Sequence, residues 1–130
     1  MLKKLSLLMM LILACNTFAN DKLPTFNSPK NPIVVSQKNP QFIITLASNP
    51  STGFSWKLLS YDKNLVQFVK HQYIAPHTKL LGAPGYEVWT FKAKKGQYRV
   101  NQVGHVVLEY QRPWTKEGAT QKSFMIIVKK

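Results

Sequence analysis

The sequence predicts an all-β domain, an immunoglobulin-like antiparallel β-sandwich of about seven strands. Two observations support this fold class: seven short apolar runs with strand-like alternation, and turn-rich connections between them. None of the runs keeps the 3.6-residue period over the three turns that a helix needs. Trp56, in the third run, falls where such sandwiches often bury an aromatic residue.

The first three runs follow one another closely. Ile33–Val35 is a short β-branched stretch. Gln41–Ser48 has a large apolar residue at every second position from Phe42 to Leu46. Phe54–Leu59 alternates Phe, Trp and Leu with polar or mixed neighbours. A period of two is typical of strands with one face on a core.

Four further runs complete the predicted sandwich. Leu65–Val69 is short and apolar, and Tyr86–Ala93 places Trp, Phe and Ala on one face with Val, Thr and Lys on the other. His105–Tyr110 alternates Val, Leu and Tyr with its other residues, and Phe124–Val128 closes the chain. Seven such strands in about 110 residues are typical of a two-sheet sandwich.

The first 19 residues have the features of a secretory signal peptide. Lys3 and Lys4 precede an apolar run of ten residues, Leu5–Ala14, which is too short to span a bilayer. Thr17–Ala19 offers the small residues that signal peptidase reads. Cleavage after Ala19 would leave about 110 residues, enough for one core.

The only cysteine, Cys15, ends the sequence Ile-Leu-Ala-Cys, which resembles a bacterial lipoprotein box. Leucine at its second position is not the usual small residue, so lipid anchoring at Cys15 and simple export after Ala19 both stay open. In either case we expect an exported protein, periplasmic or secreted, with no disulfide. Residues 20–31 are predicted as an extended lead-in and residues 32–130 as the domain.

The chain is strongly basic, with a formal net charge of +13. Without Lys3 and Lys4 the charge is +11, from 16 basic and 5 acidic residues. Such a charge suits nucleic acid, an anionic membrane face or an acidic protein. The export signal argues against nucleic acid. The densest cluster, Lys92–Lys95, is more typical of a solvated turn than of a binding patch.

Catalytic and metal-binding patterns are absent from the sequence. His71, His77 and His105 lack metal-ligand spacing and cysteine partners. Two aspartates and three glutamates offer few acid–base pairs, and no Ser, His and Asp arrangement is supported. The prediction is therefore a protein that is not an enzyme and needs no metal or cofactor.

Three unusual connections should meet at one end of the sandwich. Asn49–Gly53 combines turn-forming residues, and Pro50 fixes its own φ and lacks an N–H. Leu80–Gly85 is rich in Gly, and Arg112–Gly118 carries an exposed-looking Trp114. Taken alone, each could be an ordinary turn, and Trp114 could fold back on the sandwich.

Together these segments resemble a known family. Asn49–Phe54, Gly82–Gly85 and Arg112–Trp114 are similar, in order and spacing, to the three loop motifs of chagasin-like inhibitors of papain-family cysteine proteases. The resemblance covers roughly residues 30–130. The middle motif departs from the commoner Gly-X-Gly-Gly because Pro84 replaces a glycine, and proline has no main-chain N–H to donate at this position.

The resemblance implies a reversible, competitive inhibitor, expected to be monomeric, that plugs a protease active-site cleft with three loops. The implied protease-binding residues are Asn49, Pro50, Ser51, Thr52, Gly53, Phe54, Leu81, Gly82, Ala83, Pro84, Gly85, Arg112, Pro113 and Trp114. The alternative is a non-inhibitory envelope or adhesion module that binds an anionic surface. A membrane contact of the inhibitor is expected only through an anchor at Cys15.

Overall fold

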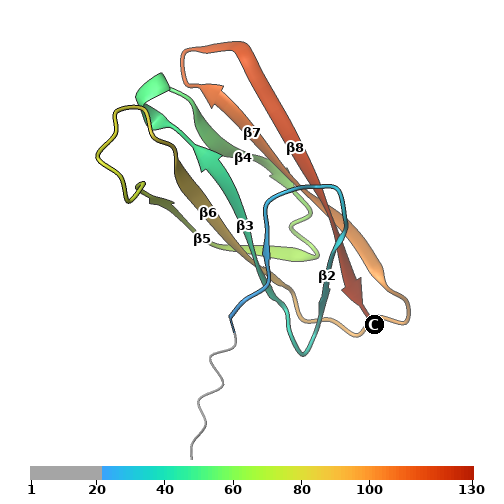
Figure 1. The fold of residues 1–130 in the computed structure, drawn as a ribbon. Coiled ribbons are helices and arrows are strands. Elements are labelled where there is room, and N and C mark those ends of the chain that lie inside the picture. Colours follow the sequence, from blue (N-terminus) through green and yellow to red (C-terminus); the bar gives the residue numbers. More distant parts are fainter. Residues whose placement is uncertain (1–21) are drawn as a thin grey trace, which may run out of the picture.

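The computed structural model describes residues 22–130, which form eight strands and one short 3₁₀ turn (Figure 1). The predicted signal peptide and the lipoprotein box at Cys15 lie outside the described residues. The strands are β1 (Thr25–Phe26), β2 (Ile33–Ser36), β3 (Gln41–Ser48), β4 (Ser55–Tyr61), β5 (Val66–Ile74), β6 (Gly85–Ala93), β7 (Gln102–Arg112) and β8 (Thr115–Lys129).

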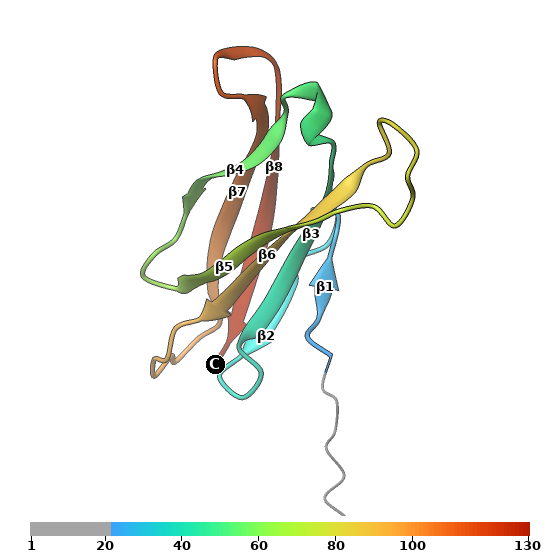
Figure 2. The same cartoon turned by 90° about the vertical axis from the view of Figure 1, so that its left-hand side faces the viewer.

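The strands pack as two four-stranded sheets, in the orders β1-β3-β6-β5 and β2-β8-β7-β4 (Figure 2). The neighbours β3–β6, β5–β6, β4–β7 and β7–β8 are antiparallel. This arrangement matches the strand order of an immunoglobulin constant-type sandwich. The predicted fold class is confirmed.

The N-terminal strands differ from a purely antiparallel prediction. β1 pairs with β3 and β2 pairs with β8, both in parallel, so each sheet is mixed. β1 is an eighth strand within the predicted lead-in, and it was missed because two residues are too few to show a period. The lead-in thus supplies the edge strand of one sheet, and the chain then crosses to form β2, the edge strand of the other.

The two sheets enclose one apolar core. Phe42 and Phe91 are fully buried and their rings stack with centroids 5.6 Å apart. Trp56 and Trp89 are also buried, as the alternation predicted. Among the described residues, every fully buried core residue lies within Ile33–Val128, and both sheets lie within residues 25–129. A chain that begins at residue 20 contains all of these residues, and we expect it to fold by itself.

A buried carboxylate, that of Glu87 near the start of β6, links the two sheets. Glu87 on β6 accepts a hydrogen bond from the backbone N–H of Trp56 on β4, at 2.8 Å, and it pairs with His71 Nε2 on β5, at 2.9 Å. The His71 ring stacks on Trp89 at 3.9 Å between centroids. Since an unpaired buried carboxylate is costly, these partners help to hold β4 of one sheet against β5 and β6 of the other.

No helix among residues 22–130 is long and apolar enough to cross a bilayer.

Candidate functional site

Three connections emerge at one end of the sandwich, which we call the loop end. They are the first loop (residues 49–54, between β3 and β4), the middle loop (residues 75–84, between β5 and β6) and the hairpin turn (Pro113 and Trp114, between β7 and β8). Figure 1 shows all three at the top of the molecule. Their convergence follows from the strand directions, as the sequence predicted.

The first loop is a closed turn with small side chains at its tip. Pro50–Thr52 forms one 3₁₀ turn, in which the Thr52 N–H donates to the Asn49 carbonyl at 3.1 Å. Gly53 ends the turn with a φ of +81°, a left-handed conformation that favours glycine. Pro50, Ser51 and Thr52 are exposed. The tip therefore offers a stiff backbone that another surface can approach closely.

Asn49 ties the first loop to the middle loop. Its side-chain Nδ2 donates to the Gly82 carbonyl at 2.8 Å, and its Oδ1 accepts from the Ser51 hydroxyl at 2.6 Å. Its backbone N–H donates to the Tyr110 hydroxyl at 3.1 Å. Asn49 thus fixes both the first loop's own shape and its spacing from Gly82.

The middle loop carries the most exposed apolar side chains of the loop end. Leu80 and Leu81 are both fully or largely exposed, and Gly82 has a φ of +76°. Ala83 donates its N–H to the Leu80 carbonyl, which closes the turn ahead of Pro84. Leu80 was not among the predicted contact residues, although two consecutive leucines in a Gly-rich loop are a recognisable signal.

Gly85 is buried in the sheet, whereas its neighbours Pro84 and Tyr86 are exposed. It is buried as the first residue of β6, and an added Cβ would lie 2.3 Å from the Ile74 carbonyl oxygen. Only glycine lets β5 and β6 approach so closely where the middle loop leaves the sheet. The predicted protease contact of Gly85 stays a prediction; in this structure its backbone sets the base of the loop.

The hairpin turn is shorter than the predicted Arg112–Gly118 loop. Arg112 pairs with Thr115, so only Pro113 and Trp114 connect the strands, and residues 115–118 belong to β8. The polar sequence after Trp114 lacks alternating apolar residues, which hid this part of the strand. Trp114 is 71% exposed. A two-residue turn holds this indole at a fixed height on a rigid hairpin.

The hairpin turn also touches the first loop. An added Cβ on Gly53 would lie 2.6 Å from Cη2 of Trp114, so the indole edge rests against this glycine. Arg112 Nε donates to the Thr52 carbonyl at 3.1 Å, and its guanidinium lies 4.5 Å above the Phe54 ring. Phe54 in turn stacks on Tyr110. Trp114 is therefore exposed and packed on the first loop at once.

The structure thus divides the predicted site residues by position. Exposed positions are Pro50, Ser51, Thr52, Leu81, Gly82, Pro84, Pro113 and Trp114. Partly buried positions are Asn49, Gly53, Phe54, Ala83 and Arg112. The partly buried residues supply the bonds that hold the loops. Tyr110 also holds the first loop, through its hydroxyl, although the sequence indicated only that Tyr110 lies in an alternating strand. Within residues 22–130, no three His, Cys, Asp or Glu side chains gather as a metal site.

Replacing Asn49 by Ala should loosen the middle loop. The substitution removes the bond to Gly82, and a single neutral hydrogen bond stabilises a fold by about 1 kcal/mol. We expect a loss of stability of that size and faster limited proteolysis within residues 75–84. Asn101→Ala is the matched control, because Asn101 makes a comparable bond to the Lys130 N–H outside the loop end. Equal cleavage rates in both variants would contradict the role of Asn49.

An ion pair just below the hairpin turn predicts a pH dependence. The Glu109 carboxylate accepts hydrogen bonds from Lys116 Nζ at 2.9 Å and Gln121 Nε2 at 3.1 Å. The bond from Lys116 lowers the pKa of Glu109 below 4.5; burial opposes this effect, and Gln121 and the charges of Lys116 and Lys57 reinforce it. The folded state therefore holds the Glu109 proton less tightly than the unfolded state does.

Because the pKa of Glu109 is lower in the folded state, its ionised carboxylate stabilises the fold at pH values above the unfolded pKa. This contribution is lost as the pH falls through the folded pKa. We expect Glu109→Gln to lower the melting temperature at pH 7, with a difference that shrinks as the pH falls through and below 4.5. Glu117→Gln is the control, because Glu117 is exposed. A difference between Glu109→Gln and the parent that stays constant with pH would refute this assignment.

The fold and the loop end together define an immunoglobulin-like sandwich that presents three mutually bonded loops at one end. Comparison with known proteins identifies its family. The family described as "Chagasin family peptidase inhibitor I42" matches residues 36–128. Chagasin from Trypanosoma cruzi is 37% identical over 91 residues, which cover 66% of this chain and 77% of chagasin.

The chain belongs to the chagasin family of peptidase inhibitors. The resemblance drawn from the loop motifs is thereby confirmed, and this family consists of inhibitors, not enzymes.

Solved structures agree on the fold. The cysteine protease inhibitor EhICP2 from Entamoeba histolytica superposes with a TM-score of 0.63 at 19% identity, over 82% of this chain and 95% of that one. The solution structure of amebosin superposes with a TM-score of 0.59 at 20% identity, over 83% of this chain and 97% of that one.

Proposed function

We propose that the protein is a reversible, competitive inhibitor of papain-family cysteine proteases, and that the loop end enters the active-site cleft. Family membership supports the inhibitor class. The observation that carries the mechanism is the linkage of all three loops through Asn49, Arg112 and Trp114. Loops that are already held in place lose little entropy on binding, which favours affinity.

Each loop has a separate part in this mechanism. The first loop lies over the catalytic cysteine, since its small side chains let the backbone approach a sulfur atom. The middle loop lies along one wall of the cleft with Leu81 outermost, and Trp114 packs on the other wall. Such an interface should bury on the order of 800 Å² per partner.

The shape of the first loop supports inhibition without cleavage. A protease attacks an extended peptide, whereas Pro50–Thr52 is wound into a hydrogen-bonded 3₁₀ turn. Unwinding this turn would break the bonds from Thr52 and Gly53 to Asn49 and Pro50. The loop therefore occupies the cleft in a form that does not align a scissile bond.

A titration of residues 20–130 against papain with a fluorogenic peptide tests the proposal. We expect nanomolar inhibition, an apparent inhibition constant that rises linearly with substrate concentration, recovery of activity on dilution, and intact inhibitor by mass spectrometry. Trypsin, a serine protease, is the control and should be unaffected. No inhibition of papain or other papain-family enzymes by folded protein would overturn the function, and inhibition independent of substrate concentration would overturn the competitive mechanism.

We also propose that the protein acts as a monomer outside the cytoplasm, in the periplasm or after secretion. The leader-like residues 1–19 support export. Mass spectrometry of protein from its native cells should find either an N-terminus at Asn20 or a lipid-modified Cys15. A chain that still begins at Met1 would contradict export, and a molar mass of a dimer in solution would contradict the monomer.

A further inference from the structure

The end of the sandwich opposite the loop end is basic. We call it the basic end and define it as residues 22–24, 37–41, 92–101 and 129–130. These segments contain half of the lysines and arginines that follow Lys4 and no aspartate or glutamate. Figure 1 shows the turn between β2 and β3, the connection between β6 and β7 and the C-terminus together at the bottom of the molecule.

Hydrogen bonds hold three of these four segments together as one surface. Gln37 Nε2 donates to the Lys94 carbonyl at 3.1 Å, and its Oε1 accepts from the Gly96 N–H at 3.1 Å. The Lys130 N–H donates to Asn101 Oδ1 at 3.0 Å. Lys38, Lys94, Lys95, Arg99, Lys129 and Lys130 are all exposed. The positive charges therefore belong to a fixed face whose segments contain no aspartate or glutamate.

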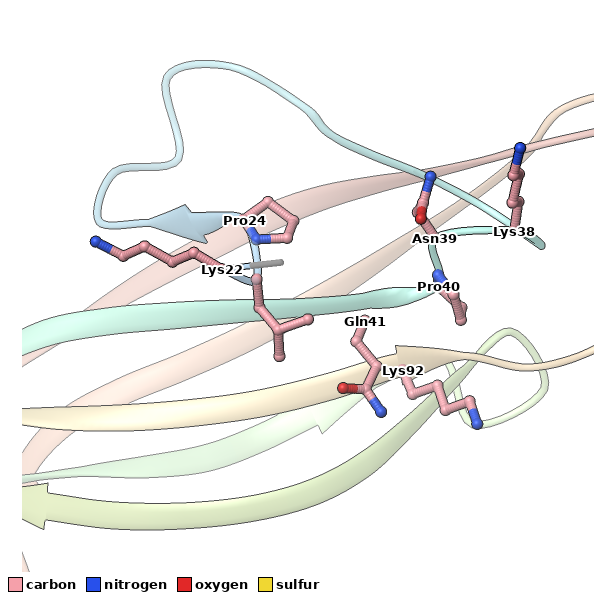
Figure 3. Close-up of a pocket in the computed structure, with 8 residues that line it drawn as sticks. Lys22, Pro24, Lys38, Asn39, Pro40, Gln41 and Lys92 are labelled. Atoms are coloured by element: carbon pink, nitrogen blue, oxygen red, sulfur yellow. The ribbon is translucent and has the colours of Figure 1, made fainter. Parts of the chain in front are cut away.

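A hollow on this face does not suit a small anion. Lys22, Lys38 and Lys92 line an open space of ≈ 560 Å³ together with Asn39, Pro40 and Gln41. Figure 3 shows the three ammonium groups pointing away from one another rather than into the hollow. A single phosphate could not contact all three. Charges that spread outward suit an extended surface with many separate anions.

The sequence before Lys22 indicates which surface this is. The described chain begins at the basic end, and Cys15 and the apolar run Leu5–Ala14 lie just upstream in the sequence. Seven residues reach at most about 25 Å. A chain anchored at Cys15, or one newly exported across a bilayer, would therefore hold the basic end next to the lipid.

We propose that the basic end docks on the surface of an anionic phospholipid bilayer and so orients the loop end away from the membrane. Clusters of lysine and arginine next to a membrane bind anionic headgroups electrostatically. The proposal is independent of the lipid modification, because the charges are present in the exported chain whether or not Cys15 is retained.

Sedimentation with lipid vesicles tests the docking surface. Residues 20–130 are mixed with vesicles of phosphatidylglycerol and phosphatidylcholine, or of phosphatidylcholine alone. We expect binding only to the anionic vesicles, and at least tenfold weaker binding when salt rises from 0.05 to 0.5 M, because salt screens exposed charges. Equal binding to both vesicle types, or no binding to anionic vesicles at low salt, would overturn the proposal.

Two charge-matched triple variants separate the basic end from overall charge. Lys38→Glu, Lys94→Glu and Lys95→Glu reverse charges on the basic end, whereas Lys30→Glu, Lys70→Glu and Lys79→Glu make the same change elsewhere, and all six lysines are exposed. We expect the first variant to bind anionic vesicles at least tenfold more weakly than the second, with melting temperatures that confirm folding. Equal losses would overturn the proposal.

Tryptophan fluorescence tests the orientation without any protease. Trp114 is 71% exposed, while Trp56 and Trp89 are 8% and 6% exposed, so acrylamide quenching reports mainly on Trp114. We expect unchanged quenching when the protein binds anionic vesicles, because the loop end faces the water. Strong protection of Trp114 would place the loop end on the lipid and overturn the proposed orientation.

Discussion

Trp114→Ala should weaken inhibition of papain by about 30-fold or more. Central tryptophans in protein interfaces contribute at least about 2 kcal/mol, and each 1.4 kcal/mol is a factor of ten. Trp114 is exposed on a two-residue turn, so the side chain is free for a partner and its loss leaves no buried cavity. The melting temperature should therefore change by only a few degrees, and the inhibition constant measures the effect.

The matched control for this variant is Val100→Ala. Val100 is also a large exposed apolar residue, and it lies on the basic end. This control should inhibit like the parent protein. A Trp114→Ala variant that inhibits papain as tightly as Val100→Ala would exclude the hairpin turn from the interface.

Gly53→Ala should damage both the fold and the inhibition. At a φ of +81° an L-residue costs about 1–2 kcal/mol, so we expect the melting temperature to fall by several degrees. The new methyl group would lie 2.6 Å from Trp114 Cη2, which forces the indole out of place. The inhibition constant should rise at least as much as for Trp114→Ala, since both the first loop and the hairpin turn are disturbed.

Gly82→Ala separates backbone strain from the clash. Gly82 has a similar φ of +76°, but an added Cβ meets nothing within 4 Å. Both variants should lose stability, whereas only Gly53→Ala should shift the emission of Trp114. In the Trp114→Ala background Gly53→Ala should raise the inhibition constant by a smaller factor, because the clash is gone. Strictly additive losses would refute the contact between Gly53 and Trp114.

Local chemistry made the loop end predictable from the sequence. Asn49-Pro50 and Gly53 specify a turn by their own backbone preferences, and Arg112-Pro113 ends a strand in the same way. The strands that bury one face, such as β3 and β6, were found because alternate residues enter the core. The family resemblance rested on these same local features.

Other features depend on contacts between distant residues. The first half of β8 is polar and mostly exposed, so its strand conformation comes from pairing with β7 rather than from its own pattern. The bridge from Glu87 to Trp56 and His71 joins side chains and backbone that are 31 and 16 residues apart in the sequence and lie on three different strands. In the sequence Tyr110 is only one more residue of an alternating strand. Its hydroxyl reaches the Asn49 N–H because the fold brings β7 beside the first loop.

The two-residue connection at Pro113 and Trp114 restricts how this inhibitor can diversify. A one-residue slip of β8 against β7 would turn every following side chain to the opposite face, Phe124 and Ile126 of the core included, so an inserted residue would have to be taken up in the turn that carries Trp114. The middle loop is free of that restriction, because its ten residues are not paired across a ladder. Changes in target range among relatives should therefore accumulate as altered length and composition between Ile74 and Gly85, while the hairpin keeps its length.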